Sequence, residues 1–285
     1  MNEMSGSLVR CNVSLAYSIN DPAGKGIAEA LRKLTEARPI QAPYAVEAWL
    51  LPAFNALLAG FAEDVLYFEF LDKVTECSFH LILSRHSSEA GIKSLTVHHP
   101  GNPVKEAKAG GQPLELPPSN PHYTKVLLLN LFASKDKLKN FKVTYEVTHH
   151  GPSSLCRPVT FIEIGSSENE WLLKEAHEVV AEAVIETLVR QPPYCEPTVG
   201  IGGNHYAGLF TERALSTNEA YGHMIAKYAL RDLENPTLVE KIIELSVLRS
   251  SIITKKLVVE EKLRKAWREA AERVAEKHDL ELTYI

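Results

Sequence analysis

Two patterns of apolar residues alternate along this chain. Short runs that are continuous or alternating in hydrophobicity are typical of strands, and segments with an apolar residue every three or four positions are typical of helices. Strands are expected at 8–18, 65–70, 79–83, 95–97, 142–147, 159–164, 198–201 and 251–254. Helices are expected at 123–131, 168–188, 219–230, 238–248 and 258–278. Such alternation predicts an α/β fold.

Local signals mark where some of the helices begin. Asp21 is followed by a proline, which is the sequence of a helix N-cap and its first turn. Ser167 with Glu170 and Ser216 with Glu219 both have the spacing of a capping box. We therefore expect helices to start at these three places.

The chain shows no internal repeat and no long linker, so we predict a single domain over residues 1–285. One segment, 100–121, is rich in proline and glycine and lacks a regular period. Long irregular loops in compact domains are uncommon and usually functional. Because this segment directly follows a histidine pair, we interpret it as a functional loop.

Composition narrows the class of protein. The chain has 285 residues, 31 Lys+Arg and 36 Asp+Glu, which gives a net charge of -5, so any RNA binding must come from a local patch. The purest patch is the lysine run Lys135, Lys137, Lys139 and Lys142, since the lysines and arginines near the C-terminus are interspersed with glutamates. The four cysteines form no Cys-x-x-Cys pair, and no apolar run is long enough to span a bilayer. We expect a cytoplasmic protein, a monomer, with no membrane association and no evident protein partner.

The 11 histidines are the strongest chemical signal. Several of them come within a few residues of the end of an expected strand: His86, His98, His99, His149, His150 and His205. If these strands are parallel, the histidines converge at one edge of the sheet. Imidazoles grouped in this way bind zinc or transfer protons, and Glu163 supplies a nearby carboxylate. The alternative is that each histidine only hydrogen-bonds the backbone of its own loop.

Other motifs exclude some enzymes and suggest binding elements. There is no G-x-S-x-G and no H-E-x-x-H sequence, which argues against serine hydrolases of the common type and against zincins. Lys25 follows a helix start at which a phosphate could bind, although the segment lacks a complete phosphate-loop motif. Gly202 and Gly203 predict a backbone-lined pocket wall from which His205 and Tyr206 project.

Blocks of sequence resemble a known family. These blocks are SRHSSEAGIKSLTVHHPGN (84–102), EVTHHGPSS (146–154), FIEIGSSENEW (161–171), GIGGNHYA (200–207) and YGHMIAKYAL (221–230). Together with the opening DPAGKGIAEAL, they resemble the D-aminoacyl-tRNA deacylases of archaea and plants. The resemblance implies hydrolysis of the ester between a D-amino acid and the terminal ribose of tRNA. It also implies a three-layer α/β/α fold with a mixed sheet, similar to phosphorylase and peptidyl-tRNA hydrolase, and Zn²⁺ as cofactor, two ions per chain.

This resemblance and the residue patterns described above together suggest roles for individual residues. The family's histidines match His86, His98, His149, His150, His205 and His223. We expect His86, His98, His149 and His205 to bind metal, and His150 and Glu163 to be catalytic. Gly202, Gly203, Tyr206 and Lys25 are expected to bind substrate, and Lys135, Lys137 and Lys139 to bind the tRNA. The alternatives are another zinc-dependent hydrolase, such as a peptidyl-tRNA hydrolase or an exopeptidase, and a non-catalytic tRNA-binding protein.

Overall fold

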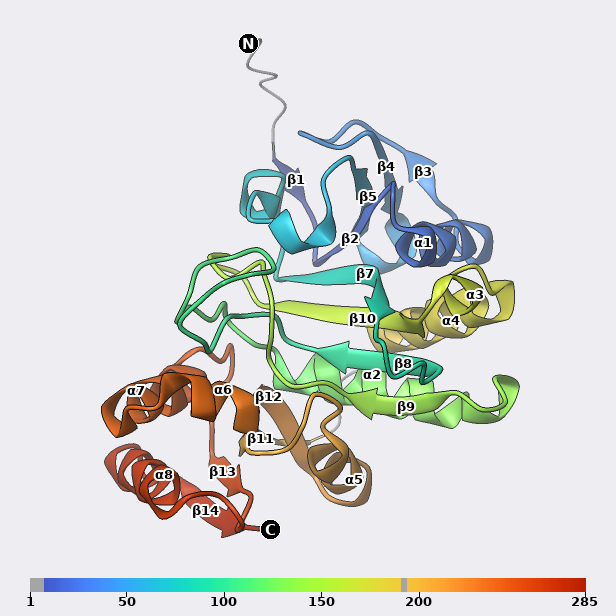
Figure 1. The fold of residues 1–285 in the computed structure, drawn as a ribbon. Helices are drawn as coiled ribbons and strands as arrows, with labels where there is room; N and C mark the ends of the chain where they lie inside the picture. Colours follow the sequence, from blue (N-terminus) through green and yellow to red (C-terminus); the bar gives the residue numbers. More distant parts are fainter. Residues whose placement is uncertain (1–7, 191–193) are drawn as a thin grey trace.

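The computed structural model describes residues 8–190 and 194–285. Its main sheet has eight strands in the order β3-β4-β5-β2-β7-β10-β8-β9. Strands β5, β2, β7 and β10 are parallel to one another, whereas β8 runs antiparallel to β10 and is followed by the parallel β9, as the arrows in Figure 1 show. The strands are β2 (Val13–Ser18), β3 (Arg38–Pro39), β4 (Glu47–Leu51), β5 (Ala56–Phe61), β7 (Phe79–Ser87), β8 (Ser94–His98), β9 (Lys142–Tyr145) and β10 (Val159–Ser166).

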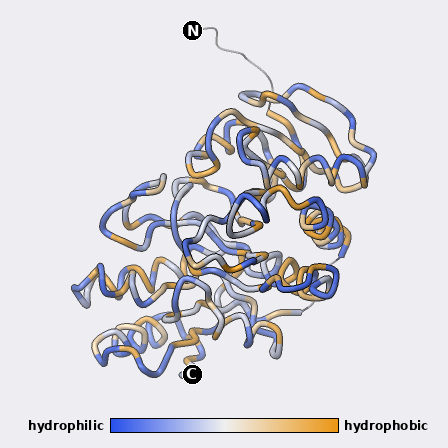
Figure 2. Tube along the Cα trace, turned by 45° about the vertical axis from the view of Figure 1, so that its right-hand side comes forward, coloured by the Kyte–Doolittle hydropathy of each residue, from blue (hydrophilic) through white to orange (hydrophobic). Residues whose placement is uncertain are grey.

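Three helices cover one face of the main sheet. They are α1 (Pro22–Leu34), α2 (Pro121–Ala133) and α4 (Lys174–Val189), and their apolar residues share a core with Leu81 and Leu83 of β7 and Ile162 of β10. In Figure 2 the trace of the helices alternates between orange and blue, as expected for helices with one apolar and one polar face. The opposite face of the sheet carries a smaller apolar cluster and is covered by loops and short 3-10 turns. We call this opposite face the site face.

A second sheet of four parallel strands has the order β12-β11-β13-β14. Helices α2 and α5 pack on one side of it, and α6, α7 and α8 pack on the other. The predicted α/β fold is therefore confirmed: the main sheet is mixed and has helices on one face, whereas the parallel second sheet lies between two layers of helices. The elements of this region are β11 (Glu196–Ile201), α5 (Gly208–Ser216), β12 (Glu219–Ile225), α6 (Lys227–Leu233), α7 (Pro236–Leu248), β13 (Lys256–Val259), α8 (Lys265–Lys277) and β14 (Glu281–Tyr284).

The two sheets meet at the segment that follows β9. A β-bridge joins Glu146 to Tyr206, and the Val147 amide donates to the His205 carbonyl at 3.1 Å. The next amide, that of Thr148, donates to the carbonyl of Met224 in β12 at 2.8 Å. Backbone hydrogen bonds thus place residues from the two sheets side by side at this junction.

Several expected elements are wrong, and tertiary pairing explains them. Residues 219–230 were expected to be a helix, but they form β12 and the start of α6, because residues 219–225 pair with β11 as a buried edge strand of the second sheet. Ser216 is therefore the last residue of α5 and caps no helix, whereas the capping box of Ser167 and Glu170 is present at α3 (Glu168–Trp171). The strand expected at 65–70 is instead the 3-10 turn η2 (Val65–Tyr67). Residues 251–254 do not form the expected strand, which begins two residues later as β13 (Lys256–Val259).

The remaining short elements lie outside these two sheets or at the margins of the helices. They are β1 (Val9–Arg10), η1 (Pro52–Phe54), η3 (Leu71–Lys73), β6 (Thr75–Glu76) and η4 (Lys135–Lys137). In the part of the chain that the structure describes, no helix has both the length and the apolar character that a bilayer crossing requires.

Candidate active site

Histidines from two strands meet across a buried carboxylate on the site face. His86 lies near the end of β7 and pairs with Gly165, while His98 ends β8 and pairs with Phe161. Glu163 stands between these two positions on β10, and alternate residues of a strand share one face. Its Oε2 is 3.5 Å from His86 Nδ1 and 3.7 Å from His98 Nε2. Its Oε1 accepts a hydrogen bond from Ser84 Oγ at 2.6 Å.

The prediction that the histidines converge at one edge of the sheet is therefore wrong. Because β8 runs antiparallel to β10, the ends of β7 and β8 lie at opposite edges of the sheet. The histidines still converge, but over the face of the sheet, at the level of Glu163.

A second carboxylate, Glu146, lies at the centre of the other histidines. His86 Nδ1 is 3.1 Å from its Oε1, while His205 Nε2 and His149 Nε2 are 3.3 and 3.5 Å from its Oε2. Glu146 follows β9 directly and has no solvent exposure. It was not predicted from the sequence, although its position three residues before a histidine pair was a usable signal.

The adjacent residues His149 and His150 both contribute to this cluster. Their ring centroids are 4.3 Å apart, and both rings lie within 5 Å of the His98 ring. His150 has a φ of +48°, in the left-handed region, which is how two consecutive residues come to project to the same side. The Nδ1 atoms of His149 and His150 donate to the carbonyls of Val147 and Gly151 at 2.8 and 2.7 Å, which leaves the Nε2 lone pairs free.

Several polar atoms in the cluster are buried without a hydrogen bond. Both carboxylate oxygens of Glu146 and both ring nitrogens of His98 belong to this group. Burying such atoms unpaired is costly, because they lose their hydrogen bonds to water. The donor atoms also fall into groups whose members all lie within 4.8 Å of one another: His98, His149 and His150 form one, His86, Glu146 and His205 form another, and the overlapping set of His98, Glu146 and Glu163 lies between them. Imidazole and carboxylate are ligands that zinc prefers, so the residues fit two adjacent metal sites.

Burial and mutual charge set the ionisation of the cluster. Burial disfavours the charged form of Glu163, but His86 and His98 outweigh it and hold the pKa of Glu163 well below its usual range. Burial, with His98 alongside, lowers the pKa of His150 to about 4. At neutral pH Glu163 is therefore ionised and His150 is neutral. A neutral imidazole is the form that can bind a metal ion.

Comparison with known proteins identifies the family. Residues 74–283 match the family model described as D-aminoacyl-tRNA deacylase. The chain belongs to the D-aminoacyl-tRNA deacylase family. It is 41% identical to the D-aminoacyl-tRNA deacylase of Desulfurococcus amylolyticus, over 96% of this chain and all of that one. It is 38% identical to that of Staphylothermus marinus, over 95% of this chain and 98% of the other. A crystal structure of a conserved protein of unknown function superimposes with a TM-score of 0.86 at 32% identity, over 96% of this chain and 95% of that one.

Within this deacylase fold, the pocket wall predicted from the glycines lies beside the histidines. Tyr206 places its hydroxyl 3.1 Å from His86 Nε2. Gly202 and Gly203 have φ values of +123° and +77°, and a Cβ on Gly202 would come within 2.6 Å of the Cβ of Glu260. The glycines therefore form the tight turn that carries His205 and Tyr206 to the cluster.

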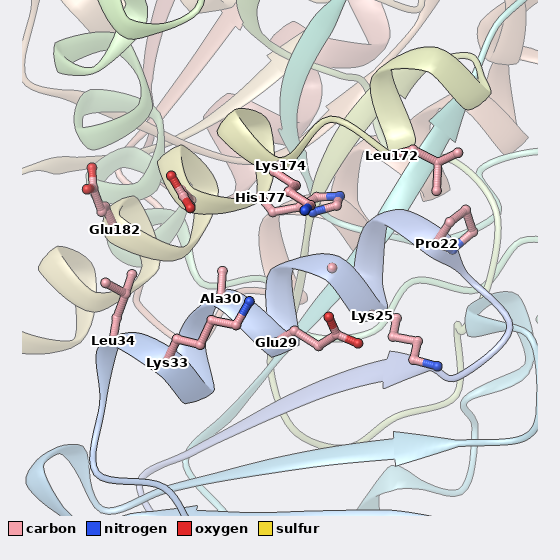
Figure 3. Close-up of a pocket in the computed structure, with 12 residues that line it drawn as sticks. Pro22, Lys25, Glu29, Ala30, Lys33, Leu34, Leu172, Lys174, His177 and Glu182 are labelled. Carbon is pink, nitrogen blue, oxygen red and sulfur yellow. The ribbon is translucent and has the colours of Figure 1, made fainter.

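Lys25, by contrast, is not brought to the histidines. It lies on α1, on the helix-covered face of the sheet, in a groove of about 580 Å³ that it shares with Glu29, Lys33 and His177 (Figure 3). The expected role of Lys25 in substrate binding at the histidine cluster is thus not supported by its position.

The predicted lysine patch lies at the end of α2. Lys135 and Lys137 belong to η4, where Lys135 lies over the ring of Phe132 and Lys137 is paired with Glu182 of α4. Lys139 is exposed in the connection to β9. A role for these lysines in tRNA binding stays a prediction.

Two further histidines stabilise the surroundings of the cluster. His99 points away from it, with Nδ1 2.9 Å from the Val159 carbonyl and Nε2 2.8 Å from the Thr124 hydroxyl. His223, a family-matched position, is 3.1 Å from the Thr148 hydroxyl and 2.9 Å from the Pro117 carbonyl. Burial lowers the pKa of His99 to about 3 and that of His223 to about 4, so both are neutral hydrogen-bonding groups.

The proline- and glycine-rich segment 100–121 forms part of the wall of the cluster. The Gly101 amide donates to the His150 carbonyl at 2.6 Å, and the Gly151 amide donates to the Ala109 carbonyl at 2.8 Å. A β-bridge also joins Pro100 to His149. The segment therefore holds the histidine pair by its backbone.

Proposed function

We propose that this chain hydrolyses the ester bond of D-aminoacyl-tRNA at the histidine and glutamate cluster, releasing a free D-amino acid and tRNA. The observation that carries the proposal is Glu146, a fully buried carboxylate with no hydrogen bond that lies within 3.5 Å of three imidazole nitrogens. Membership of the deacylase family supports the choice of reaction. A protein that only binds tRNA has no need of such a buried group of donors.

The donor groups support a cofactor of two zinc ions. His98, His149 and His150 would hold one ion, and His86, Glu146 and His205 would hold the other. This arrangement makes His150 a ligand in place of the catalytic role expected from the sequence. Bound zinc supplies Lewis-acid polarisation of an ester carbonyl and makes water more acidic.

Glu163 remains as the residue that accepts a proton. Its low pKa keeps it ionised, and Ser84 holds one of its oxygens so that the other points between His86 and His98. Glu163 accepts the proton that leaves the attacking water and returns it to the ribose oxygen of the leaving tRNA as the ester bond breaks. Tyr206, fixed by its contact with His86, lines the open side of the cluster, where His205 is partly exposed.

The deciding experiment measures deacylation of D- and L-aminoacyl-tRNA by the purified chain, together with its zinc content. We expect hydrolysis of the D-form, little hydrolysis of the L-form, and close to two zinc ions per chain. The variant Glu146→Gln should lose zinc and at least ~100-fold in rate, because it removes a charged ligand. Glu212→Gln, an exposed glutamate on α5, is the matched control. Equal rates on both stereoisomers, or no reaction with either, would contradict the proposal.

A further inference from the structure

One edge of the main sheet brings cations next to the proposed active site. Because β8 and β9 run opposite to β7 and β10, the ends of one pair lie beside the starts of the other (Figure 1). The register places His86, Gly165, Ser94 and Lys142 on one line across four strands. At the usual spacing between strands, the Cα atoms of His86 and Lys142 are therefore about 14 Å apart.

Tyr206 spans the space between these two residues. Its hydroxyl is 3.1 Å from His86 Nε2, and the ammonium group of Lys142 lies over its ring, 5.2 Å from the centroid. The β-bridge to Glu146 holds the backbone of Tyr206 against the segment that follows β9. The tyrosine thus fixes Lys142 relative to the open side of the cluster.

Lys142 differs from the other cationic side chains at this edge because no carboxylate in the described part of the chain neutralises its charge. Arg85 lies 3.6 Å from Asp64, and Lys93 lies 3.3 Å from Glu170. Lys142 is exposed and has no carboxylate partner among residues 8–190 and 194–285. In a chain with a net charge of -5, an unneutralised cation beside the site is a specific feature that can receive an anion.

We propose that Lys142, held over Tyr206, binds the phosphate that joins the last two nucleotides of the tRNA. This inference rests on the proposed function, since it places the terminal ester at the His86 end of the cluster. The phosphate and the ester are attached to the same ribose, so a contact at the phosphate sets the distance of the ester from the catalytic groups. Lysine contacts to phosphate carry no sequence information, which suits an enzyme that accepts many tRNAs.

The test is a double-mutant cycle on RNA binding, which needs no catalysis. Binding of uncharged tRNA and of the same tRNA without its 3′-terminal nucleotide is measured for the wild-type chain and for Lys142→Ala, at several salt concentrations. We expect Lys142→Ala to weaken binding of the complete tRNA about 10-fold and to reduce the salt slope by about one phosphate contact. Binding of the shortened tRNA should be almost unchanged by the substitution, because the phosphate in question is absent. Lys241→Ala, at an exposed lysine on α7, is the control and should bind both RNAs like the wild type.

Two results would overturn this assignment. Equal weakening on both RNAs would show that Lys142 contacts another part of the tRNA. If Lys142→Ala weakened binding of neither RNA, Lys142 would bind no phosphate. A loss of binding in the triple variant of Lys135, Lys137 and Lys139 would then place the phosphate contact at the end of α2. Failure of the proposed function is recognised separately, by wild-type protein that binds tRNA and does not cleave D-aminoacyl-tRNA.

Discussion

Two adjacent histidines, His98 and His99, have different roles: the first faces the proposed active site and the second forms hydrogen bonds that stabilise the fold. His98 and His99 are both fully buried, yet the nitrogens of His98 have no hydrogen bond while both nitrogens of His99 have one. Successive residues of a strand point to opposite faces, so only one of the two can face the cluster. We therefore expect opposite consequences when each is replaced.

We predict that His98→Ala removes the zinc ion that it would hold with His149 and His150 and lowers the deacylation rate at least ~100-fold, with little change in the stability of the zinc-free protein. His99→Ala should keep zinc and most of the specific activity, but lose about 1–3 kcal/mol of folding free energy, because it leaves the Val159 carbonyl unpaired. Urea unfolding with chelator present, zinc analysis and kinetics on the same two variants give the answer. Loss of stability in both variants with zinc retained in both would assign a structural role to His98 as well.

At the scale of elements, the turn between β11 and α5 depends on a residue that follows β13, the strand next to β11 in the second sheet. Glu260, just after β13, accepts a hydrogen bond from the Gly203 amide at 2.8 Å and lies 3.1 Å from Lys227 Nζ. The glutamate is buried, and Gly203 and Lys227 outweigh the effect of burial and lower its pKa. This contact fixes the turn that carries His205 and Tyr206.

We predict that Glu260→Ala lowers kcat for D-aminoacyl-tRNA about 10-fold, because the turn loses its anchor and His205 is less well placed. Glu260→Gln retains an acceptor for the Gly203 amide and should recover most of the loss. The neighbouring exposed Glu261, replaced by alanine, is the control. A Glu260→Ala enzyme with normal kcat and zinc content would show that the turn is held by other contacts.

At the scale of the whole molecule, a buried ionic network in the second sheet makes stability depend on pH. Glu219 of β12 accepts from Arg213 Nε at 2.7 Å and from the Tyr221 hydroxyl at 2.6 Å, and lies 3.2 Å from Lys256 Nζ. Burial opposes ionisation of Glu219, but these partners outweigh it and lower its pKa. A lowered folded pKa contributes stability above the unfolded value, about 4.3, and the contribution is lost as the pH falls through the folded value.

We predict that Glu219→Gln costs about 1–3 kcal/mol of folding free energy at pH 7 and that this cost becomes smaller as the pH falls below about 4. Unfolding by urea across this pH range, with and without the substitution, measures the difference. A gap between the two proteins that stays constant or widens on acidification would contradict the assignment. That residues 1–285 form a single domain stays a prediction, which limited proteolysis would test.

The sequence alone determined the helix caps, the fold class and most of the histidines of the candidate site, because each depends on local chemistry. Asp21 and Ser167 cap helices as predicted, because their side chains bond amides only two or three positions away. The α/β class followed from hydrophobic periodicity, and the histidines of the candidate site were found because they follow strands. Each of these signals lies within a few residues of the feature that it predicts.

Only the tertiary structure decided the direction of β8, the strand character of 219–225 and the position of Glu146 at the centre of the cluster. These depend on partners between about 20 and 70 residues away along the chain, such as β11 for β12 and His86 and His205 for Glu146. The helical pattern was overridden at 219–225 because a strand there forms backbone hydrogen bonds with β11. Lys25 and Lys142 show the same limit, since the face or edge of the sheet on which each lies is set by packing and register and not by neighbouring residues.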